Sequence, residues 1–255
     1  MLLFPPAKIN LGLLILGKYP NGYHQLETLM VAAPALRDQL ELLPASGPGC
    51  TFELSGIPLD GSTADNLCVR AYNLLAEAVP DLPGVTIRLE KGIPAGAGLG
   101  GGSADAAYTL RGINELFGLK LPVTRLHEMA ARLGADVPFF LYDQPMLASG
   151  TGTTLEPFPL DLPFRLHIET PPIHSATMAA YKGLNLTECD PGRSLRHLLA
   201  QPVALWRDVL VNDLEQPVFR MYPELAEIKA RLYAEGAIYA AMSGSGSAVF
   251  GLFPQ

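Results

Sequence analysis

The sequence of 255 residues predicts an α+β fold in two domains. Short apolar runs with strand-like alternation are mixed with segments whose apolar residues recur at helical spacing. A proline-rich stretch with few charges, residues 154–163, divides the chain. We therefore expect one domain over residues 1–158 and a second over residues 159–255, with a cleft between them.

The composition is that of a folded protein and argues against two classes of partner. Hydrophobic residues make up 49% of the chain and charged residues 17%, which excludes a disordered chain. The formal net charge of −7 argues against nucleic acid or an anionic membrane as a partner, because both require a basic surface. A small anionic substrate stays open, since it needs only a locally positive site.

The cysteines and the N-terminal segment favour a cytoplasmic protein. Cys50, Cys68 and Cys189 are widely spaced and form no CxxC pair, which suits reduced thiols better than disulfides or a zinc site. The apolar run from Leu11 to Leu16 is too short to span a membrane, and it lacks the flanks of a signal peptide.

In the first domain, strand and helix patterns follow one another closely. The predicted strands cover residues 7–18, 38–45, 50–56 and 84–94, and strand-like residues also follow the turn signal at residues 20–22 as far as residue 33. The predicted helices cover residues 65–79, 103–118 and 124–134, with Asp65 and Ser103 as the expected N-caps of the first two.

The second domain has a similar mixture. A strand is expected from residue 164, helices over residues 176–182, 206–214 and 223–235, and a last strand over residues 248–253. The run of small residues at 243–247, SGSGS, comes directly before that strand.

A glycine-rich run at residues 94–104, PAGAGLGGGSA, follows a predicted strand and opens a predicted helix. This arrangement binds phosphates, because the N–H groups of the loop converge on the anion and the helix dipole adds positive charge. The run is no Walker loop, since no lysine follows it, and it comes too late in its domain for a dinucleotide fold. A flexible linker is the other interpretation.

Three polar residues stand alone among apolar neighbours. Lys8 and Asn10 lie two residues apart on a predicted strand and so share one face. Asp136 lies between a helix end and the apolar run VPFFL. A charge among apolar residues is costly unless it faces a site, although a surface lysine or a capping aspartate would explain each one singly.

Taken together, these segments resemble the GHMP kinases, which include galactokinase and the homoserine and mevalonate kinases. The segments PAKINLGL, NGYHQLETL, DNLCVRA, IPAGAGLGGGSADAA, LGADVPFFL and SGSGSAVFG occur in family order along almost the whole chain. The resemblance implies an N-terminal ATP-binding α/β domain and a C-terminal ferredoxin-like α/β domain, with the active site in the cleft.

Within the family, GYH and GADVPFF resemble the branch that acts on a cytidine diphosphate conjugate in non-mevalonate isoprenoid synthesis. The resemblance implies ATP-dependent phosphorylation of the 2-hydroxyl on the methylerythritol part of that conjugate, with Mg²⁺. It makes Lys8 and Asp136 the catalytic pair.

The same resemblance assigns binding roles to the other motifs. The implied ATP contacts are Asn66, Pro94, Ala95, Gly96, Ala97, Gly98, Leu99, Gly100, Gly101, Gly102, Ser103 and Ala104, with Ser103 also near the metal. The implied substrate contacts are Asn10, Tyr23, His24, Thr177 and Tyr181, with aromatic rings against the cytosine. A turn histidine and a packed core tyrosine are the other interpretations of His24 and Tyr181.

Two departures and two alternatives accompany the resemblance. Ala104 stands where the family often has a second serine, and the chain ends eight residues after Ser247, where the family continues through a further helix and strand. The alternatives are another GHMP kinase, such as a homoserine or mevalonate kinase, and a non-catalytic nucleotide-binding module. We expect a monomer or a weak homodimer.

Overall fold

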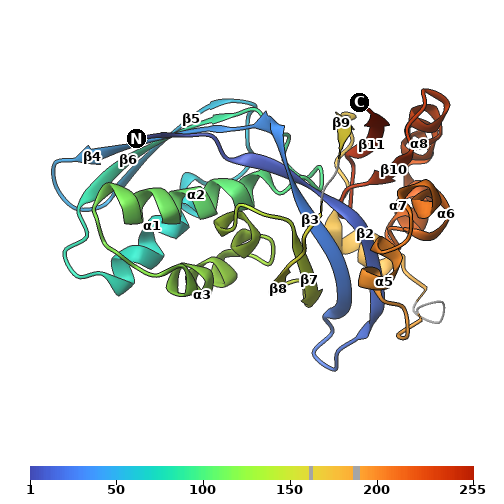
Figure 1. Cartoon of the computed structure of the whole chain (residues 1–255). Helices are drawn as coiled ribbons and strands as arrows, with labels where there is room; N and C mark the ends of the chain where they lie inside the picture. Colours follow the sequence, from blue (N-terminus) through green and yellow to red (C-terminus); the bar gives the residue numbers. More distant parts are fainter. Residues whose placement is uncertain (161–162, 186–189) are drawn as a thin grey trace. The chain divides into compact units, whose positions relative to one another are not determined.

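Two compact units make up the structure, a computed structural model that describes residues 1–160, 163–185 and 190–255 (Figure 1). Unit 1 comprises residues 1–8, 33–95 and 100–143, and unit 2 comprises residues 9–32, 96–99 and 144–255. The units are thus interleaved along the chain, which is a different division from the domain boundary expected at residues 158 and 159. That boundary stays a prediction.

Unit 1 is built on a four-stranded sheet in the order β1-β4-β6-β5. β5 runs parallel to β6, whereas the other neighbours are antiparallel. Helices α1, α2 and α3 lie together on one face of this sheet (Figure 1). Its elements are β1 (Leu2–Leu3), β4 (Gln39–Ala45), β5 (Cys50–Gly56), η1 (Thr63–Asp65), α1 (Leu67–Ala78), β6 (Gly84–Lys91), α2 (Gly101–Leu116), α3 (Val123–Leu133) and η2 (Val137–Leu141).

The alternation of β6 explains why helices cover only one face. Val85, Ile87 and Leu89 are buried, whereas Arg88 and Glu90 are exposed. Successive side chains of a strand point to opposite faces, so the apolar set packs in the core and the charged set faces solvent. This confirms the half-buried strand predicted for this segment.

Two helix starts differ from the prediction. The N-cap of α1 is Asn66, whose Oδ1 accepts a hydrogen bond from the N–H of Cys68, because Asp65 is taken up in the 3₁₀ turn η1. The N-cap of α2 is Gly100, at φ 69°, and Ser103 lies within the first turn. Asp65 and Ser103 as N-caps were therefore wrong predictions.

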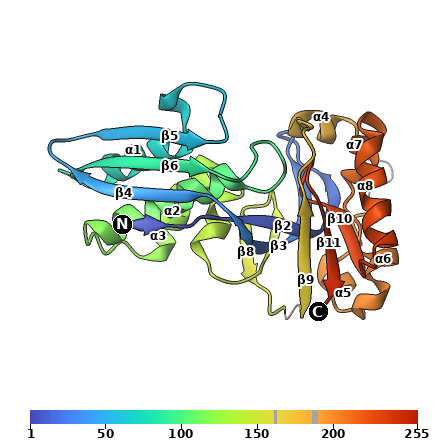
Figure 2. The same ribbon diagram turned by 90° about the horizontal axis from the view of Figure 1, so that it is seen from above.

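Unit 2 carries two sheets, in the orders β2-β3-β7-β8 and β10-β11-β9 (Figure 2). The first sheet is formed by β2 (Pro6–Lys18), β3 (His24–Arg37), β7 (Met146–Gly150) and β8 (Thr154–Pro157), of which β2 and β3 also contribute residues to unit 1. The second is formed by β9 (Phe164–Glu169), β10 (Tyr239–Met242) and β11 (Val249–Pro254). The helices are α4 (Thr177–Lys182), α5 (Leu195–Leu199), η4 (Val203–Leu205), α6 (Trp206–Val209), α7 (Glu215–Met221) and α8 (Pro223–Ala234).

The helix predicted over residues 206–214 is shorter in the structure, because α6 ends at Val209. The next residues pair with β2 instead: the N–H of Leu13 donates to the carbonyl of Val211, and that of Asp213 donates to the carbonyl of Leu13. Tertiary hydrogen bonding to a strand has thus replaced the local helical pattern.

The core of unit 2 lies between β10 and β11 and the helices beside them. α8 packs on both strands, and Leu225, Leu232, Met242, Val249 and Phe253 belong to one buried cluster. None of the helices in the described parts of the chain has the length and apolar composition needed to cross a membrane.

Candidate functional site

Lys8 and Asp136 form an ion pair in unit 1, with 3.3 Å between Nζ of Lys8 and Oδ2 of Asp136. Lys8 lies on β2 and its side chain is 3% exposed, whereas the side chain of Asp136 is 35% exposed. Asp136 directly precedes the buried 3₁₀ turn η2, which fixes its backbone. The ammonium is therefore held inside the protein and the carboxylate remains accessible from solvent.

The ion pair lies beside the start of α2. A Cβ atom added to Gly100 would be 3.1 Å from Cγ of Lys8 and 3.0 Å from Cζ of Phe140. Gly100 also has a left-handed backbone, at φ 69°. A side chain at this position would be strained and crowded, so glycine is needed where the lysine passes the helix start.

The glycine run makes three left-handed turns before α2 begins. Gly96, Gly98 and Gly100 have φ values of 68°, 75° and 69°. The N–H groups at the start of α2 have no carbonyl one turn earlier to bond to, so they are available to an anion together with the positive end of the helix dipole. The arrangement of strand, loop and helix predicted from the sequence is confirmed.

The first turn of α2 has both a crowded and an open side. A Cβ atom on Gly101 would lie 2.9 Å from Cγ2 of Ile93, whereas one on Gly102 would meet only Cδ1 of Leu67, at 3.7 Å. Gly101 is thus required by packing in its own unit, but Gly102 is not. Glycine at position 102 keeps the exposed side free for close approach of another group.

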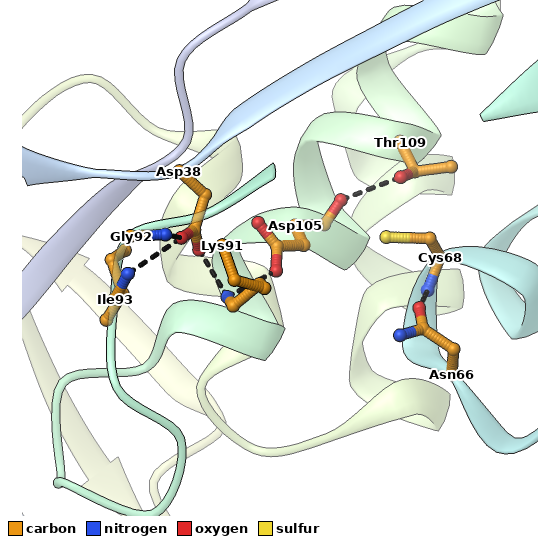
Figure 3. Close-up of polar contacts among 8 residues, drawn as sticks. All are labelled: Asp38, Asn66, Cys68, Lys91, Gly92, Ile93, Asp105 and Thr109. Atoms are coloured by element: carbon orange, nitrogen blue, oxygen red, sulfur yellow. Dashed lines mark hydrogen bonds and ion pairs between the residues drawn. The ribbon is translucent and has the colours of Figure 1, made fainter. Parts of the chain in front are cut away.

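A buried cluster of Lys91, Asp38 and Asp105 lies in unit 1 at the two ends of this run (Figure 3). Nζ of Lys91 donates to Oδ2 of Asp38 and, at 2.8 Å, to Oδ2 of Asp105. Oδ1 of Asp38 accepts the N–H groups of Gly92 and Ile93, at 2.6 and 2.8 Å. One ammonium therefore joins the residues before the loop to the helix after it.

The cluster holds two carboxylates and one ammonium, and the pKa values of Asp105 and Lys91 are shifted. Burial raises the pKa of Asp105 to about 7; the charge of Lys91 opposes this rise and that of Asp38 adds to it. Burial acts to lower the pKa of Lys91, but the charges and hydrogen bonds of the two carboxylates raise it overall. Oδ1 of Asp105 is buried and finds no hydrogen-bond partner among the described residues.

In unit 2, the SGSGS segment holds residues 97 and 98 of the glycine run. The hydroxyl of Ser243 donates to the carbonyl of Gly98 at 2.9 Å, and the N–H of Ala248 donates to the carbonyl of Ala97. A Cβ atom on Gly98 would be 2.1 Å from the carbonyl oxygen of Ser243, so the two backbones approach closely. Asn212 supports the segment by donating to the carbonyls of Met242 and Gly244, both at 2.8 Å.

The residues of unit 2 that are predicted to contact the cytosine differ in their surroundings. The rings of His24 and Tyr181 lie against each other, with centroids 4.8 Å apart and planes tilted by 31°. Burial and the charge of Lys18 lower the pKa of His24, which favours its neutral form. Tyr23 is 65% exposed, and the hydroxyl of Thr177 lies 2.9 Å from that of Ser245.

Two polar residues of the predicted site also have roles within the fold. Nδ2 of Asn10 donates to Oγ1 of Thr28 at 2.9 Å, and Thr28 donates in turn to the carbonyl of Gly12. Asn66 uses its Oδ1 to cap α1. The contact of Asn10 with substrate and that of Asn66 with adenine stay predictions.

Four polar residues around the glycine run were not found from the sequence: Asp38, Lys91, Asp105 and Asn212. Lys91 and Asp105 flank the loop, so their charge within an apolar setting was a usable signal. Asp38 and Asn212 are far from the loop in sequence, and only the fold brings them to their partners.

The residues near the glycine run could hold Mg²⁺ only through few protein ligands. Within the described ranges, no group of three or more His, Cys, Asp or Glu side chains is placed to hold a metal ion. Mg²⁺ is commonly bound through one or two protein groups and the phosphates of the nucleotide. The half-buried hydroxyl of Ser103, in the first turn of α2, is compatible with such a site.

Two family models match stretches of this chain. Residues 66–144 match the family model for the GHMP kinases N terminal domain. Residues 195–255 match the model for the GHMP kinases C terminal region. A homoserine kinase structure from Cytophaga hutchinsonii, 20% identical, has the same fold with a TM-score of 0.76 and covers 99% of this chain and 84% of its own.

Relatives with higher sequence identity indicate which branch of the GHMP kinases this chain resembles. A 4-diphosphocytidyl-2-C-methyl-D-erythritol kinase of Bacteroides fragilis is 46% identical over 99% of this chain and 92% of its own length. The enzyme of the same name from Azobacteroides pseudotrichonymphae is 44% identical over 100% of this chain and 94% of its own.

A crystal structure agrees with these relatives. The solved structure of a 4-(cytidine 5'-diphospho)-2C-methyl-D-erythritol kinase is 38% identical, covers 99% of this chain and 90% of its own, and has a TM-score of 0.84. The chain therefore belongs to the 4-diphosphocytidyl-2-C-methyl-D-erythritol kinase family of the GHMP kinases.

Proposed function

We propose that this enzyme transfers the γ-phosphoryl group of ATP to the 2-hydroxyl of 4-diphosphocytidyl-2-C-methyl-D-erythritol, with ADP as the second product. As a GHMP kinase, the chain is an ATP-dependent small-molecule kinase. The names of its relatives support the assignment of this acceptor. The observation that carries the chemistry is the Lys8–Asp136 pair beside Gly100, at the start of α2.

In the proposed mechanism, Asp136 accepts the proton of the acceptor hydroxyl as the phosphoryl group is transferred. Its carboxylate is 35% exposed and can therefore be reached by a substrate. Lys8 holds that carboxylate in place and stabilises the negative charge that develops near the nucleophile. The buried stem of Lys8 restricts where its ammonium can move.

The glycine run receives the phosphates of ATP in this proposal. Backbone N–H groups at the start of α2 donate to phosphate oxygens, and the open side at Gly102 allows the close approach that this requires. Mg²⁺, when bound, would supply positive charge to the phosphates of ATP. The hydroxyl of Ser103 would hold the metal, and Asn66 would lie on the adenine side.

The cytidine part of the acceptor binds at His24 and Tyr181 in this proposal, with Tyr23, Thr177 and Asn10 as further contacts. Aromatic rings stack on a base at about 1–3 kcal/mol per contact. The lowered pKa of His24 leaves a neutral imidazole that can both donate to and accept from the cytosine edge.

The expectations on cellular context belong to the same proposal. The free thiols of Cys50 and Cys68 suit the reducing cytoplasm. Cys189, the third thiol, lies outside the described residues. We expect the enzyme to act there as a monomer or weak homodimer, with two domains that meet near residues 158 and 159.

The test is a direct assay of acceptor specificity. The purified enzyme is incubated with ATP, Mg²⁺ and one acceptor at a time, and ADP formation is followed. The cytidine diphosphate conjugate should support turnover, while galactose, homoserine and mevalonate should not. Turnover with homoserine or mevalonate would favour another GHMP kinase activity. ATP binding without turnover on any acceptor would favour a non-catalytic nucleotide-binding module.

A further inference from the structure

The ion cluster of Lys91, Asp38 and Asp105 ties together the two ends of the glycine run. Asp38 precedes β4 and accepts the N–H groups of Gly92 and Ile93, which lead into the run. Asp105 lies in α2, which leaves the run, and accepts a hydrogen bond from Lys91 at 2.8 Å. Figure 3 shows the Lys91 ammonium between the two carboxylates.

Burial strengthens the ionic interactions of this cluster. The side chains of Lys91, Asp38 and Asp105 are 2%, 0% and 3% exposed. Screening by water and salt is small at such a position, and charge-assisted hydrogen bonds are stronger there than on a surface. A Cβ atom on Gly101 would be 3.2 Å from Nζ of Lys91, so the ammonium lies directly behind the first turn of α2.

The composition of the cluster indicates a role beyond stability. Two carboxylates share one ammonium, and Oδ1 of Asp105 is buried without a hydrogen-bond partner among the described residues. Apolar side chains at these positions would avoid the cost of burying charge. A cluster that is unfavourable in this way and lies at a functional loop is typical of a site where geometry is selected over stability.

We propose that Asp105, through Lys91, is a positioning residue that holds the glycine run in the shape that receives the phosphates of ATP. The inference rests on the proposed function. Asp105 itself touches no phosphate in this account. It fixes the first turns of α2 relative to residues 91–93, and with them the N–H groups at the helix start.

The experiment compares ATP affinity in three variants by calorimetry, with magnesium and without acceptor. Asp105→Ala removes the tether but leaves Lys91 balanced by Asp38, so the protein should still fold. Loss of one charge-assisted hydrogen bond should weaken ATP binding about tenfold. Asp105→Asn keeps an oxygen that accepts from Lys91 and should recover most of this affinity.

Ile113→Val is the matched control. Ile113 is fully buried in the same helix, and the loss of one methylene lowers stability without touching the loop. Its ATP affinity should be that of the wild type. In Asp105→Ala, amides of residues 92–104 should exchange faster, whereas the KM for the acceptor and kcat at saturating ATP should stay within about twofold of wild type.

Three results would overturn the inference. They are unchanged ATP affinity in folded Asp105→Ala, equal weakening in Ile113→Val, and no recovery in Asp105→Asn. Failure of the proposed function would be seen separately, because the wild type itself would then fail to bind ATP or to phosphorylate the conjugate.

Discussion

Unit 1 contains two lysine–aspartate arrangements that differ in one physical property, the exposure of the carboxylate. Asp136 is 35% exposed beside buried Lys8, whereas Asp38 and Asp105 are almost completely buried around Lys91. Both arrangements flank α2, at Gly100 and at Gly101. An accessible carboxylate can take a proton from a substrate, while an enclosed one can only hold the backbone.

The difference also separates chemistry from stability. Removal of Lys8 leaves the carboxylate of Asp136, which water can solvate, so the cost should appear in turnover. Breaking the buried cluster leaves a charge that water cannot reach, so the cost should appear in folding. Substitutions of matched shape in the two arrangements test this distinction.

The largest effect is expected for Asp136→Asn. Asparagine keeps the shape of aspartate but cannot accept a proton at neutral pH. General-base catalysis contributes about 10²–10⁴-fold, so kcat should fall by that range while ATP affinity stays close to wild type. Steady-state kinetics and calorimetry provide the measurements. A variant that keeps most of its turnover would show that transfer needs positioning alone.

Lys91→Met should instead act on folding. It leaves Asp38 and Asp105 buried without their cation, and removal of one partner of a buried ion pair typically costs about 3–5 kcal/mol. Urea denaturation should show a loss of this size in the free energy of unfolding.

The control for this variant is Arg88→Met on the same strand. Arg88 is paired with Glu41 and Glu53, but its side chain is 51% exposed. Exposed ion pairs contribute little, so its effect should be much smaller. Equal losses in the two variants would mean that burial of the cluster does not decide its energetics.

Lys8→Met makes the same chemical change in the pair whose carboxylate is accessible to solvent. The methionine fills the buried channel of the lysine stem, and Asp136 remains solvated, so the protein should stay folded. Removal of one preorganised group that stabilises developing charge costs about 10²-fold in kcat. ATP affinity should change little in equilibrium binding. Loss of nucleotide binding with normal turnover at saturating ATP would contradict the assignment of Lys8 to the acceptor.

The comparison explains which parts of the site can be predicted from sequence. The glycine run, Lys8 and Asp136 each stand in a local pattern, a strand–loop–helix or a charge amid apolar residues, and the structure contains those local patterns. The buried cluster depends on the antiparallel pairing of β4 with β6, which sets Gln39 opposite Glu90. No local pattern around Asp38 contains that pairing.

Prediction of the secondary structure was limited in the same way, by contacts between residues distant in sequence. The strands and helices of unit 1 were largely predictable, because their periodicity agrees with their burial. The helix expected over residues 206–214 failed where residues 211–213 bond to Leu13, almost 200 positions away. The N-cap at Asn66 was missed by one residue, because a 3₁₀ turn holds Asp65.

The smallest effect is expected in the pH dependence of folding, where Asp105 differs from an exposed carboxylate. Its pKa in the folded protein is about 7, above the ordinary value of 3.8. Between these values the folded state keeps a proton that the unfolded state has lost. The stabilisation that Asp105 provides is therefore fully present below about pH 4 and is lost as the pH rises through about 7.

The measurement is urea denaturation of the wild type and Asp105→Asn between about pH 4 and pH 8, without nucleotide or magnesium. The stability of the wild type relative to the variant should fall by about 1–2 kcal/mol across this range, less than the full shift implies, because Asp38 and Lys91 share the titration. Asp143→Asn, at a carboxylate that is 82% exposed, should show no such trend. A relative stability that is constant, or that rises with pH, would mean that Lys91 keeps Asp105 ionised throughout, and the imbalance of charge in the cluster would then have no energetic consequence.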